Sequence, residues 1–340
     1  MRILVTGGAG YVGSISVERL VDAGHDVVVL DDLSTGHRGA ADQVILEVGS
    51  YGDGPALAAL LERHRIEAIL HCAARSLVAE SIADPARYYR DNVADGIALL
   101  EAVRALGIRR LVFSSTAAVY GVPSRTPIPE EAPLDPINPY GETKRTFEAA
   151  LRWYGTAYGL RSVALRYFNV AGATERNGEQ HDPETHLIPS ILSAVEAGRP
   201  LTVFGTDYPT PDGTNVRDYI HVADLADAHL AALEATSPDD PRTDAPDAPG
   251  DPSWGRAVAI NLGSAAGFSV REVIAAAERV LGRPIPTLDG PRRPGDPPIL
   301  VASNEQARAV LGWAPGRGSL DEMIGSAWAW FRANPAGYGG

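Results

Sequence analysis

The sequence predicts an α/β protein with a doubly wound parallel sheet, followed by a smaller, irregular α/β domain. In the first half, short β-branched runs alternate with longer amphipathic runs, which is the order of strands and helices in a parallel sheet. Several of the short runs are apolar on both faces, as in central strands that helices cover from both sides. After about residue 170 this alternation stops, and the loops become longer and richer in glycine and proline.

The individual elements follow from the same periodicities. Strands are expected at Ile3–Thr6, Val27–Asp31, Val44–Val48, Ala68–His71, Leu111–Ser115 and Val163–Arg166. Helices are expected at Gly13–Ala23, Pro55–Arg65, Pro85–Leu106 and Tyr140–Tyr158, and later at Leu187–Ala197, Val222–Glu234, Val270–Leu281 and Asn304–Leu311. Gly24 and Gly107 each follow an expected helix, at the position where a left-handed residue ends it.

The chain is expected to divide into two domains. Residues 1–168 would form the sheet domain and residues 169–340 mainly a domain that caps the carboxyl ends of the strands. Segments at about 216–235 and 257–264 would return to the first domain. Residues 237–252 contain five prolines and five aspartates without periodicity. Because such a segment lacks apolar surface to offset its ordering entropy, we expect a mobile surface loop there.

Composition and charge narrow the classes of partner. A formal charge of −13 disfavours nucleic acid, whose binding needs clustered Lys and Arg. No apolar run approaches the roughly 20 residues that span a bilayer, and the N-terminus enters a strand at once, so neither a membrane span nor a secretory signal is expected. The one cysteine, Cys72, excludes an internal disulfide and a cysteine-built zinc site. We therefore expect a cytoplasmic protein without a metal site.

A glycine-rich turn opens the chain. The first strand runs into Thr6-Gly-Gly-Ala-Gly-Tyr-Val-Gly13, and a helix follows. Glycines with this spacing allow a tight turn and a close approach of the backbone to a pyrophosphate, which then lies at the N-terminus of the helix. The next strand ends in Asp31, where a carboxylate accepts from ribose hydroxyls and repels a 2′-phosphate. The turn therefore predicts a Rossmann dinucleotide site that prefers NAD to NADP.

A second signal is Tyr140-Gly-Glu-Thr-Lys144, on the helix expected after the fifth strand. Residues four apart share a helical face. A free phenol has a pKa of about 10, and a neighbouring ammonium favours the phenolate and lowers that pKa. Lys144 is also the only lysine among 30 Lys and Arg residues, which indicates a position that requires a compact primary ammonium. Tyr140 and Lys144 are therefore predicted to be a catalytic pair.

The fifth strand supplies a third signal, because it ends in Phe113-Ser-Ser-Thr-Ala-Ala-Val-Tyr-Gly121. Hydroxyls at the carboxyl end of a central strand face the crevice where ligands bind in such sheets. Thr116 is therefore a candidate to hydrogen-bond a substrate oxygen and to share its proton with Tyr140.

These three signals, in this order, resemble the extended short-chain dehydrogenase/reductase superfamily. Further segments along nearly the whole chain are similar to the UDP-glucose 4-epimerase family: Leu165-Arg-Tyr-Phe-Asn-Val-Ala-Gly-Ala173, His181-Asp-Pro-Glu-Thr-His-Leu-Ile-Pro189, the stretch 203–221, and Arg292-Arg-Pro-Gly-Asp296. The resemblance implies NAD as cofactor, a UDP-sugar as substrate, and a homodimer formed through the helices near 85–106 and 140–158. It also implies epimerisation at C4 through a 4-keto sugar, with Tyr140 transferring the hydroxyl proton.

The resemblance also implies roles for further residues. The implied cofactor set is Gly7, Gly10, Tyr11, Val12, Gly13, Asp31, Ser50, Ala73, Ala74, Ser114, Tyr140, Lys144 and Tyr167. The implied substrate set contacts the reacting hydroxyl (Thr116), the diphosphate and sugar (Asn169, His186, Leu187), the uracil (Thr202, Phe204), the phosphates (Arg217, Arg293), the uridine ribose (Asp296) and the sugar C2 substituent (Leu300). Two guanidiniums suit a diphosphate because each forms forked hydrogen bonds.

The residues after Thr116 distinguish epimerisation from related reactions that also use NAD and begin with the same oxidation step. The sugar 4,6-dehydratases place Asp-Glu there, and the UDP-glucuronate decarboxylases usually carry a glutamate in this stretch. This chain has Ala117 and Ala118, which cannot protonate a leaving hydroxyl, so elimination is disfavoured. Epimerisation of UDP-N-acetylglucosamine, UDP-glucuronate or UDP-xylose stays open, and a non-catalytic NAD-binding sensor is a remote alternative.

The chain departs from the family pattern at three positions. Ser50 stands where an aspartate usually bonds the adenine, so that contact would come from Ser50 or from Asp53. Ser76 replaces a lysine often found after the fourth strand, and Asn215 replaces a glycine just before Arg217.

Overall fold

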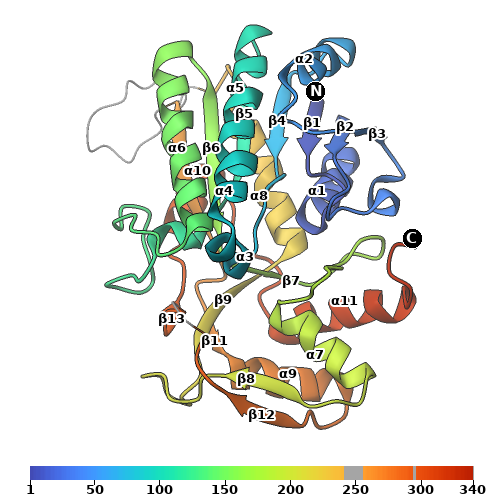
Figure 1. Ribbon diagram of the computed structural model, residues 1–340, viewed down its shortest axis with the longest axis vertical. Helices are drawn as coiled ribbons and strands as arrows, with labels where there is room; N and C mark the ends of the chain where they lie inside the picture. The colour runs from blue at the N-terminus through green and yellow to red at the C-terminus, as the bar shows by residue number, and fades with distance from the viewer. Residues whose placement is uncertain (241–255, 294–295, 340) are drawn as a thin grey trace.

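The computed structural model describes residues 1–240, 256–293 and 296–339, which form a larger and a smaller body (Figure 1). The larger body is built on a parallel seven-stranded sheet in the order β10-β6-β5-β4-β1-β2-β3. Its strands are β1 (Arg2–Thr6), β2 (Asp26–Asp31), β3 (Ile45–Val48), β4 (Ala68–His71), β5 (Arg110–Thr116), β6 (Arg161–Tyr167) and β10 (Ala257–Leu262).

Helices cover both faces of this sheet, which buries the apolar side chains on each face of the central strands. One face packs against α1 (Tyr11–Asp22), α8 (Val222–Ala235) and α10 (Glu305–Leu311). The other face packs against α2 (Gly54–Arg63), α5 (Asp95–Ala105) and α6 (Pro139–Tyr158). The doubly wound fold predicted from the sequence is therefore confirmed.

The smaller body lies beyond the carboxyl ends of the large sheet and carries its own apolar core (Figure 1). It contains a sheet of β11 (Gly267–Ser269), β9 (Val216–His221) and β13 (Ile299–Leu300), in which β9 also pairs with β7 (Asn169–Ala171). A second pair joins β8 (Leu201–Phe204) to β12 (Thr287–Gly290). The helices of this body are α7 (Leu187–Glu196), α9 (Val270–Leu281) and α11 (Leu320–Ala333).

Two helix expectations need correction. The helix expected at 85–106 consists of α4 (Pro85–Tyr89) and α5. A π-helical turn at Arg90–Ala94 joins them, and its backbone hydrogen bonds connect residues five apart instead of four. Helix α3 (Val78–Ala83) and helix α11 were not expected at all.

The segment expected to return to the larger body at 216–235 is divided by the structure. Strand β9 pairs within the small sheet, and only α8 packs on the large one. Further along the chain, β10 lies beside β6 as the edge strand of the large sheet.

The structure confirms the two expected helix-ending glycines, whereas most of the expected surface loop lies outside the described residues. Gly24 and Gly107 adopt left-handed backbone angles, with φ of 80° and 71°. Of the loop expected at 237–252, residues 241–252 lie outside the described residues. Among the helices of the described residues, none is long and apolar enough to cross a bilayer.

Candidate functional site

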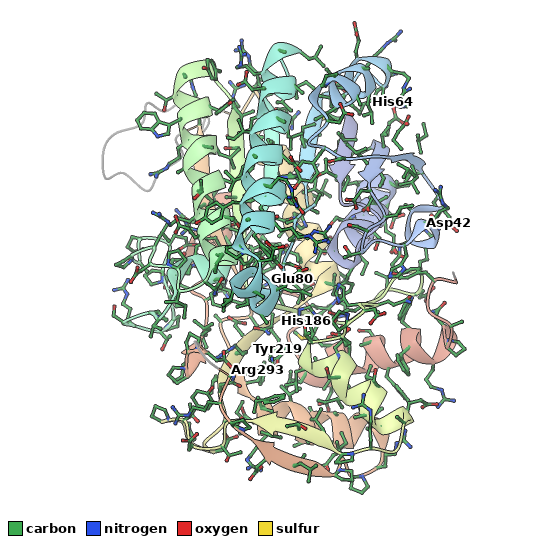
Figure 2. The ribbon with its side chains drawn as sticks, in the orientation of Figure 1. Asp42, His64, Glu80, His186, Tyr219 and Arg293 are labelled. Carbon is green, nitrogen blue, oxygen red and sulfur yellow. The ribbon has the colours of Figure 1, made fainter. Side chains whose placement is uncertain are left out.

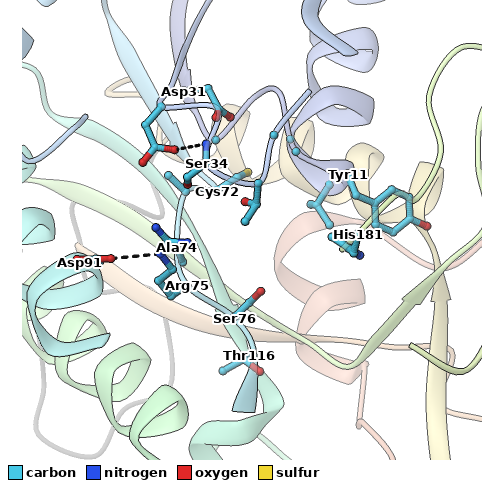
Figure 3. Close-up of a pocket in the computed structure, with 18 of the residues that line it drawn as sticks. Tyr11, Asp31, Ser34, Cys72, Ala74, Arg75, Ser76, Asp91, Thr116 and His181 are labelled. Atoms are coloured by element: carbon cyan, nitrogen blue, oxygen red, sulfur yellow. Dashed lines mark hydrogen bonds and ion pairs between the residues drawn. The ribbon is translucent and has the colours of Figure 1, made fainter. Parts of the chain in front are cut away.

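A cavity of about 350 Å³ opens at the carboxyl ends of the central strands (Figure 3). Strand β1 has β2 on one side and β4 on the other, so the chain changes direction at this point of the sheet. Ligands bind at such switch points in open parallel sheets, and the volume is typical of a small-molecule site. The cavity walls come from the turn after β1, the loops after β2, β3 and β4, the start of α6, and the loop between β7 and α7.

The turn after β1 depends on its glycines. Gly7 has a φ of 71°, and a Cβ on it would lie 2.5 Å from the backbone nitrogen of Ala73. A Cβ on Gly13 would collide with the carbonyl oxygen of Gly7. The first turn of α1 therefore approaches β1 and β4 closely, and its unpaired N–H groups face the cavity, where a pyrophosphate would bind.

Asp31, at the end of β2, lines the same cavity. Its carboxylate accepts from the backbone nitrogens of Ala9 (3.0 Å) and Leu33 (2.9 Å), which fixes the turn after β1 against the loop after β2. Burial raises the pKa of Asp31, and these hydrogen bonds oppose that effect. The glycine cradle and this carboxylate together fit the adenosine and pyrophosphate of NAD.

The two candidates for the adenine contact are separated by the structure. Ser50 lines the cavity, and its Oγ accepts from the nitrogen of Gly52 at 3.0 Å. Asp53 instead caps α2 by accepting from the nitrogen of Ala56 at 3.1 Å. Ser76 also lines the cavity, close to Arg75, which pairs with Asp91 at 3.2 Å (Figure 3).

Helix α6 brings Tyr140 and Lys144 into the cavity. The helix begins where the side chain of Asn138 accepts from the nitrogen of Gly141 at 2.9 Å. A Cβ on Gly141 would lie 2.5 Å from the carbonyl oxygen of Ala118, so glycine allows the helix to press against the segment after β5. Because Thr116 ends β5, this packing brings Tyr140 and Thr116 to the same cavity, where the Thr116 hydroxyl is close enough to lower the pKa of the phenol.

Lys144 lies one helical turn further, with only 3% of the residue exposed. Its Nζ donates to the carbonyl oxygen of Ser114 at 2.8 Å and lies 4.6 Å from the centroid of the Phe113 ring. Burial lowers the pKa of Lys144 to about 8, although Cys72 and Glu148 oppose this. The space around this ammonium is therefore small and specific.

The pKa of Tyr140 differs from the sequence expectation. Burial raises the pKa of Tyr140, and the nearby Thr116 hydroxyl only partly opposes that effect. Lys144 does not dominate because its Nζ is 6.0 Å from the centre of the Tyr140 ring and is bound to Ser114. The chain alone therefore favours the neutral phenol, and a further positive charge is required to favour the phenolate.

Most of the predicted cofactor residues line this cavity: Gly7, Gly10, Tyr11, Val12, Gly13, Asp31, Ser50, Ala73, Ala74, Tyr140, Lys144 and Tyr167. Ser114 does not line it but binds Lys144 through its carbonyl oxygen. Of the predicted substrate residues, Thr116, Asn169 and His186 line it. The others lie outside its walls: Leu187, Thr202, Phe204, Arg217, Arg293, Asp296 and Leu300.

The charged residues among these others contact other predicted substrate residues. Arg217 forms an ion pair with Asp296, and Asn215 donates to the same carboxylate at 2.7 Å. The guanidinium of Arg293 lies 4.5 Å from the centroid of the Phe204 ring. His186 and Arg293 both lie near the boundary between the two bodies (Figure 2). Leu300 pairs with Arg217 in the small sheet and packs against the buried cluster of Val119, Tyr120 and Ile128, as Phe168 of the cavity wall also does.

A cluster of two histidines and two glutamates was missed from the sequence, although its Glu-x-His-x-x-Glu-x-His spacing was visible. Glu179, His181 and His186 line the cavity, and Glu184 completes the cluster outside the cavity lining. Burial lowers the pKa of His186, but Glu179 and Glu184 outweigh it and raise the pKa to about 10. The same two carboxylates hold the pKa of His181 at about 9 against burial.

Comparison with known proteins gives consistent matches. Residues 3–243 match the model of the NAD dependent epimerase/dehydratase family. The UDP-glucose 4-epimerase of Lacticaseibacillus casei is 48% identical, over 100% of this chain and 99% of that protein. The crystal structure of UDP-glucose 4-epimerase from Brucella ovis in complex with NAD has a TM-score of 0.88 and 43% identity over 97% of this chain and 98% of that chain.

A structure of UDP-glucose 4-epimerase from Bifidobacterium longum, in complex with NAD+ and UDP, is similar at a TM-score of 0.89. It is 34% identical and covers 99% of this chain and 100% of that chain.

Proposed function

Because the chain belongs to the NAD dependent epimerase/dehydratase family, we propose that it interconverts UDP-glucose and UDP-galactose by NAD-dependent epimerisation at C4. The observation that carries this proposal is that Tyr140, Thr116 and the buried Lys144 line the same cavity as the glycine turn. Full-length similarity to UDP-glucose 4-epimerases supports the substrate class.

Each residue of this group has a separate task. Tyr140 takes the proton from the C4 hydroxyl and later returns it, and Thr116 aligns both oxygens for the transfer. Lys144 holds positive charge 6.0 Å from the centre of the Tyr140 ring and anchors α6 to β5 through Ser114. Bound NAD supplies the hydride acceptor at C4 and a positive ring that favours the phenolate. Because the hydride returns to the sugar, the cycle consumes no cofactor.

The residues after Thr116 favour epimerisation over elimination. Ala117 and Ala118 form a short 3₁₀ turn, and neither side chain can donate a proton to a leaving hydroxyl. The 4-keto sugar therefore meets no acid at these two positions that could protonate a leaving hydroxyl, which favours return of the hydride.

We assign the cofactor to the larger body and the UDP-sugar to its boundary with the smaller body. The glycine turn, Asp31 and Ser50 would hold NAD along the cavity. Asn169 and His186 would reach the diphosphate from the loop that enters the smaller body. Arg217 and Arg293, with Asp296, would hold the nucleotide end, which requires the ion pair between Arg217 and Asp296 to open or to share its donors with the ligand.

We also propose a homodimer and a cytoplasmic location. Trp153 on α6 is 72% exposed, and Tyr89 on α4 and Tyr158 on α6 are exposed as well. Large exposed aromatic side chains on neighbouring helices are typical of an interface. The free thiol of Cys72, half-buried in the cavity wall, suits a reducing compartment.

The test is turnover by the purified holoprotein without added NAD. UDP-glucose, UDP-N-acetylglucosamine, UDP-glucuronate and UDP-xylose are supplied separately, and the epimers are resolved by chromatography. We expect UDP-galactose from UDP-glucose, and loss of roughly 10²–10⁴-fold in kcat for Tyr140→Phe, the usual contribution of a general acid–base group. Absence of product from all four sugars would refute the proposal.

A further inference from the structure

We propose that Glu179, His181, Glu184 and His186 form a four-ligand site for Zn²⁺ in the wall of the nucleotide cavity. These residues come from one short stretch between β7 and α7. One ligand atom from each lies within 4.8 Å of the others. Three of the four also line the cavity, so an ion would reach the site from there.

The distances between the ligand atoms fit a tetrahedral ion. Zinc bonds to imidazole and carboxylate are about 2.0–2.2 Å long, which places ligand atoms about 3.3 Å apart. Nδ1 of His181 lies 3.2 Å from Glu179 and 3.8 Å from Glu184. Nδ1 of His186 lies 2.6 Å from Glu179 and 3.5 Å from Glu184. Movements of a few tenths of an ångström to about one ångström would therefore complete the coordination.

The site is held in place by its surroundings. Glu184 accepts from the backbone nitrogens of Thr185 and His186, both at 2.7 Å, which fixes its carboxylate at the start of α7. The stretch before Glu179 is fixed by Tyr338, which exchanges hydrogen bonds with Gly178. Metal sites depend on such supporting contacts, because they fix the ligands in advance.

The donor set selects the kind of ion. Two imidazole nitrogens and two carboxylate oxygens suit zinc, whereas Mg²⁺ and Ca²⁺ prefer shells of oxygen. The two carboxylates also balance the charge of a divalent ion. An arrangement with ion pairs alone satisfies the glutamates but leaves the buried Nδ1 of His181 without a hydrogen bond to any described residue. A bound metal would give that nitrogen a direct bond, in place of an ion pair with Glu179 at 3.2 Å whose geometry makes no hydrogen bond.

The experiment measures zinc binding directly, on untagged holoprotein treated with a chelator and dialysed against Zn²⁺ at pH 8, where imidazole competes better for the metal. His181→Phe keeps a ring against Tyr11 but removes one ligand. Glu184→Gln weakens a second ligand. His64→Phe is the matched control, because His64 also pairs with a glutamate, Glu47 at 2.7 Å, outside the cluster.

We expect one zinc per chain in the wild type and in His64→Phe, and at least roughly 100-fold weaker zinc binding in the two cluster variants. Loss of a residue that only supports a ligand already costs up to about 100-fold in metal affinity, so loss of a ligand itself should cost at least as much. X-ray absorption should show nitrogen and oxygen at about 2.0–2.2 Å and no sulfur. Zinc should raise the midpoint of thermal unfolding of the wild type and of His64→Phe but not that of His181→Phe, while all three proteins fold equally in chelator. Equal binding by wild type and His181→Phe, a sulfur ligand, or no stoichiometric zinc would overturn the proposal.

Discussion

Replacement of the single lysine by arginine is the sharpest test of the catalytic group. In Lys144→Arg the positive charge is kept, but the larger, planar guanidinium must enter a space between the carbonyl oxygen of Ser114, at 2.8 Å from Nζ, and the Phe113 ring, at 4.6 Å. Forcing a larger group into a packed interior costs typically about 1–3 kcal/mol. That strain falls on α6, one turn from Tyr140.

The expected loss of activity follows from this displacement. A shift of about 1 Å in a catalytic group costs on the order of 100-fold in rate. We therefore expect kcat for the UDP-galactose to UDP-glucose conversion to fall at least roughly 100-fold. NAD content is measured in a denatured extract, so that loss of the cofactor can be told from loss of the chemical step.

Arg145→Lys is the matched control for this substitution. Arg145 is the next residue on the same helix, and its guanidinium pairs with Glu142 at 2.6 Å in an exposed position. Exposed ion pairs contribute about 0–1 kcal/mol, so this exchange should leave kcat unchanged. A kcat of Lys144→Arg within about threefold of wild type, at full NAD content, would refute the requirement for a compact ammonium.

Three further outcomes are expected. Gly141→Ala should lower kcat at least roughly tenfold in steady-state assays, because its Cβ would lie 2.5 Å from the carbonyl oxygen of Ala118 and push Tyr140 away from Thr116; unchanged kcat would contradict the packing argument. Leu300→Tyr should lower activity on UDP-N-acetylglucosamine more than on UDP-glucose, and equal losses would count against its place near the C2 substituent. Between pH 8 and 10.5, the free energy of unfolding of the wild type should rise by up to about 3 kcal/mol relative to that of Lys144→Met, measured by chemical unfolding. The reason is that burial lowers the pKa of Lys144 to about 8 in the folded state only, so folding favours the neutral amine. A difference that does not change with pH would show that burial does not penalise this charged amine.

The larger body was predictable because its elements carry strong local signals. Most of its strands are apolar runs of four to seven residues, and Gly24 and Gly107 end helices with left-handed backbone angles. The smaller body is different because β7, β11 and β13 contain only two or three residues. Their extended backbone comes from pairing with β9, which a local sequence pattern does not encode.

The missed helix α11 did carry a local signal. Its N-cap, Ser319, accepts from the nitrogen of Glu322 at 3.2 Å, and that Ser-x-x-Glu spacing is visible in the sequence.

The site was predictable to a similar degree. The glycine turn and the Tyr140–Lys144 spacing are local patterns, so the sequence places them at one edge of the sheet. The pKa values are set by burial and by contacts from distant segments, so the raised pKa of Tyr140 could not be read from its neighbours on the helix. The cluster around His186 lies in an irregular loop, where spacing says little about which side chains converge.

The return of α8 and β10 to the larger body affects how the protein folds as it leaves the ribosome. When residue 168 has been synthesised, β6 still lacks its neighbour β10, and the face that Leu225 and Leu233 of α8 will cover is open. An unpaired strand edge beside an uncovered apolar face is a template for aggregation. Nearly a hundred more residues, up to Leu262, must emerge before the edge is closed. A nascent chain stalled in that interval should therefore depend on chaperones, whereas one released after Leu262 should not.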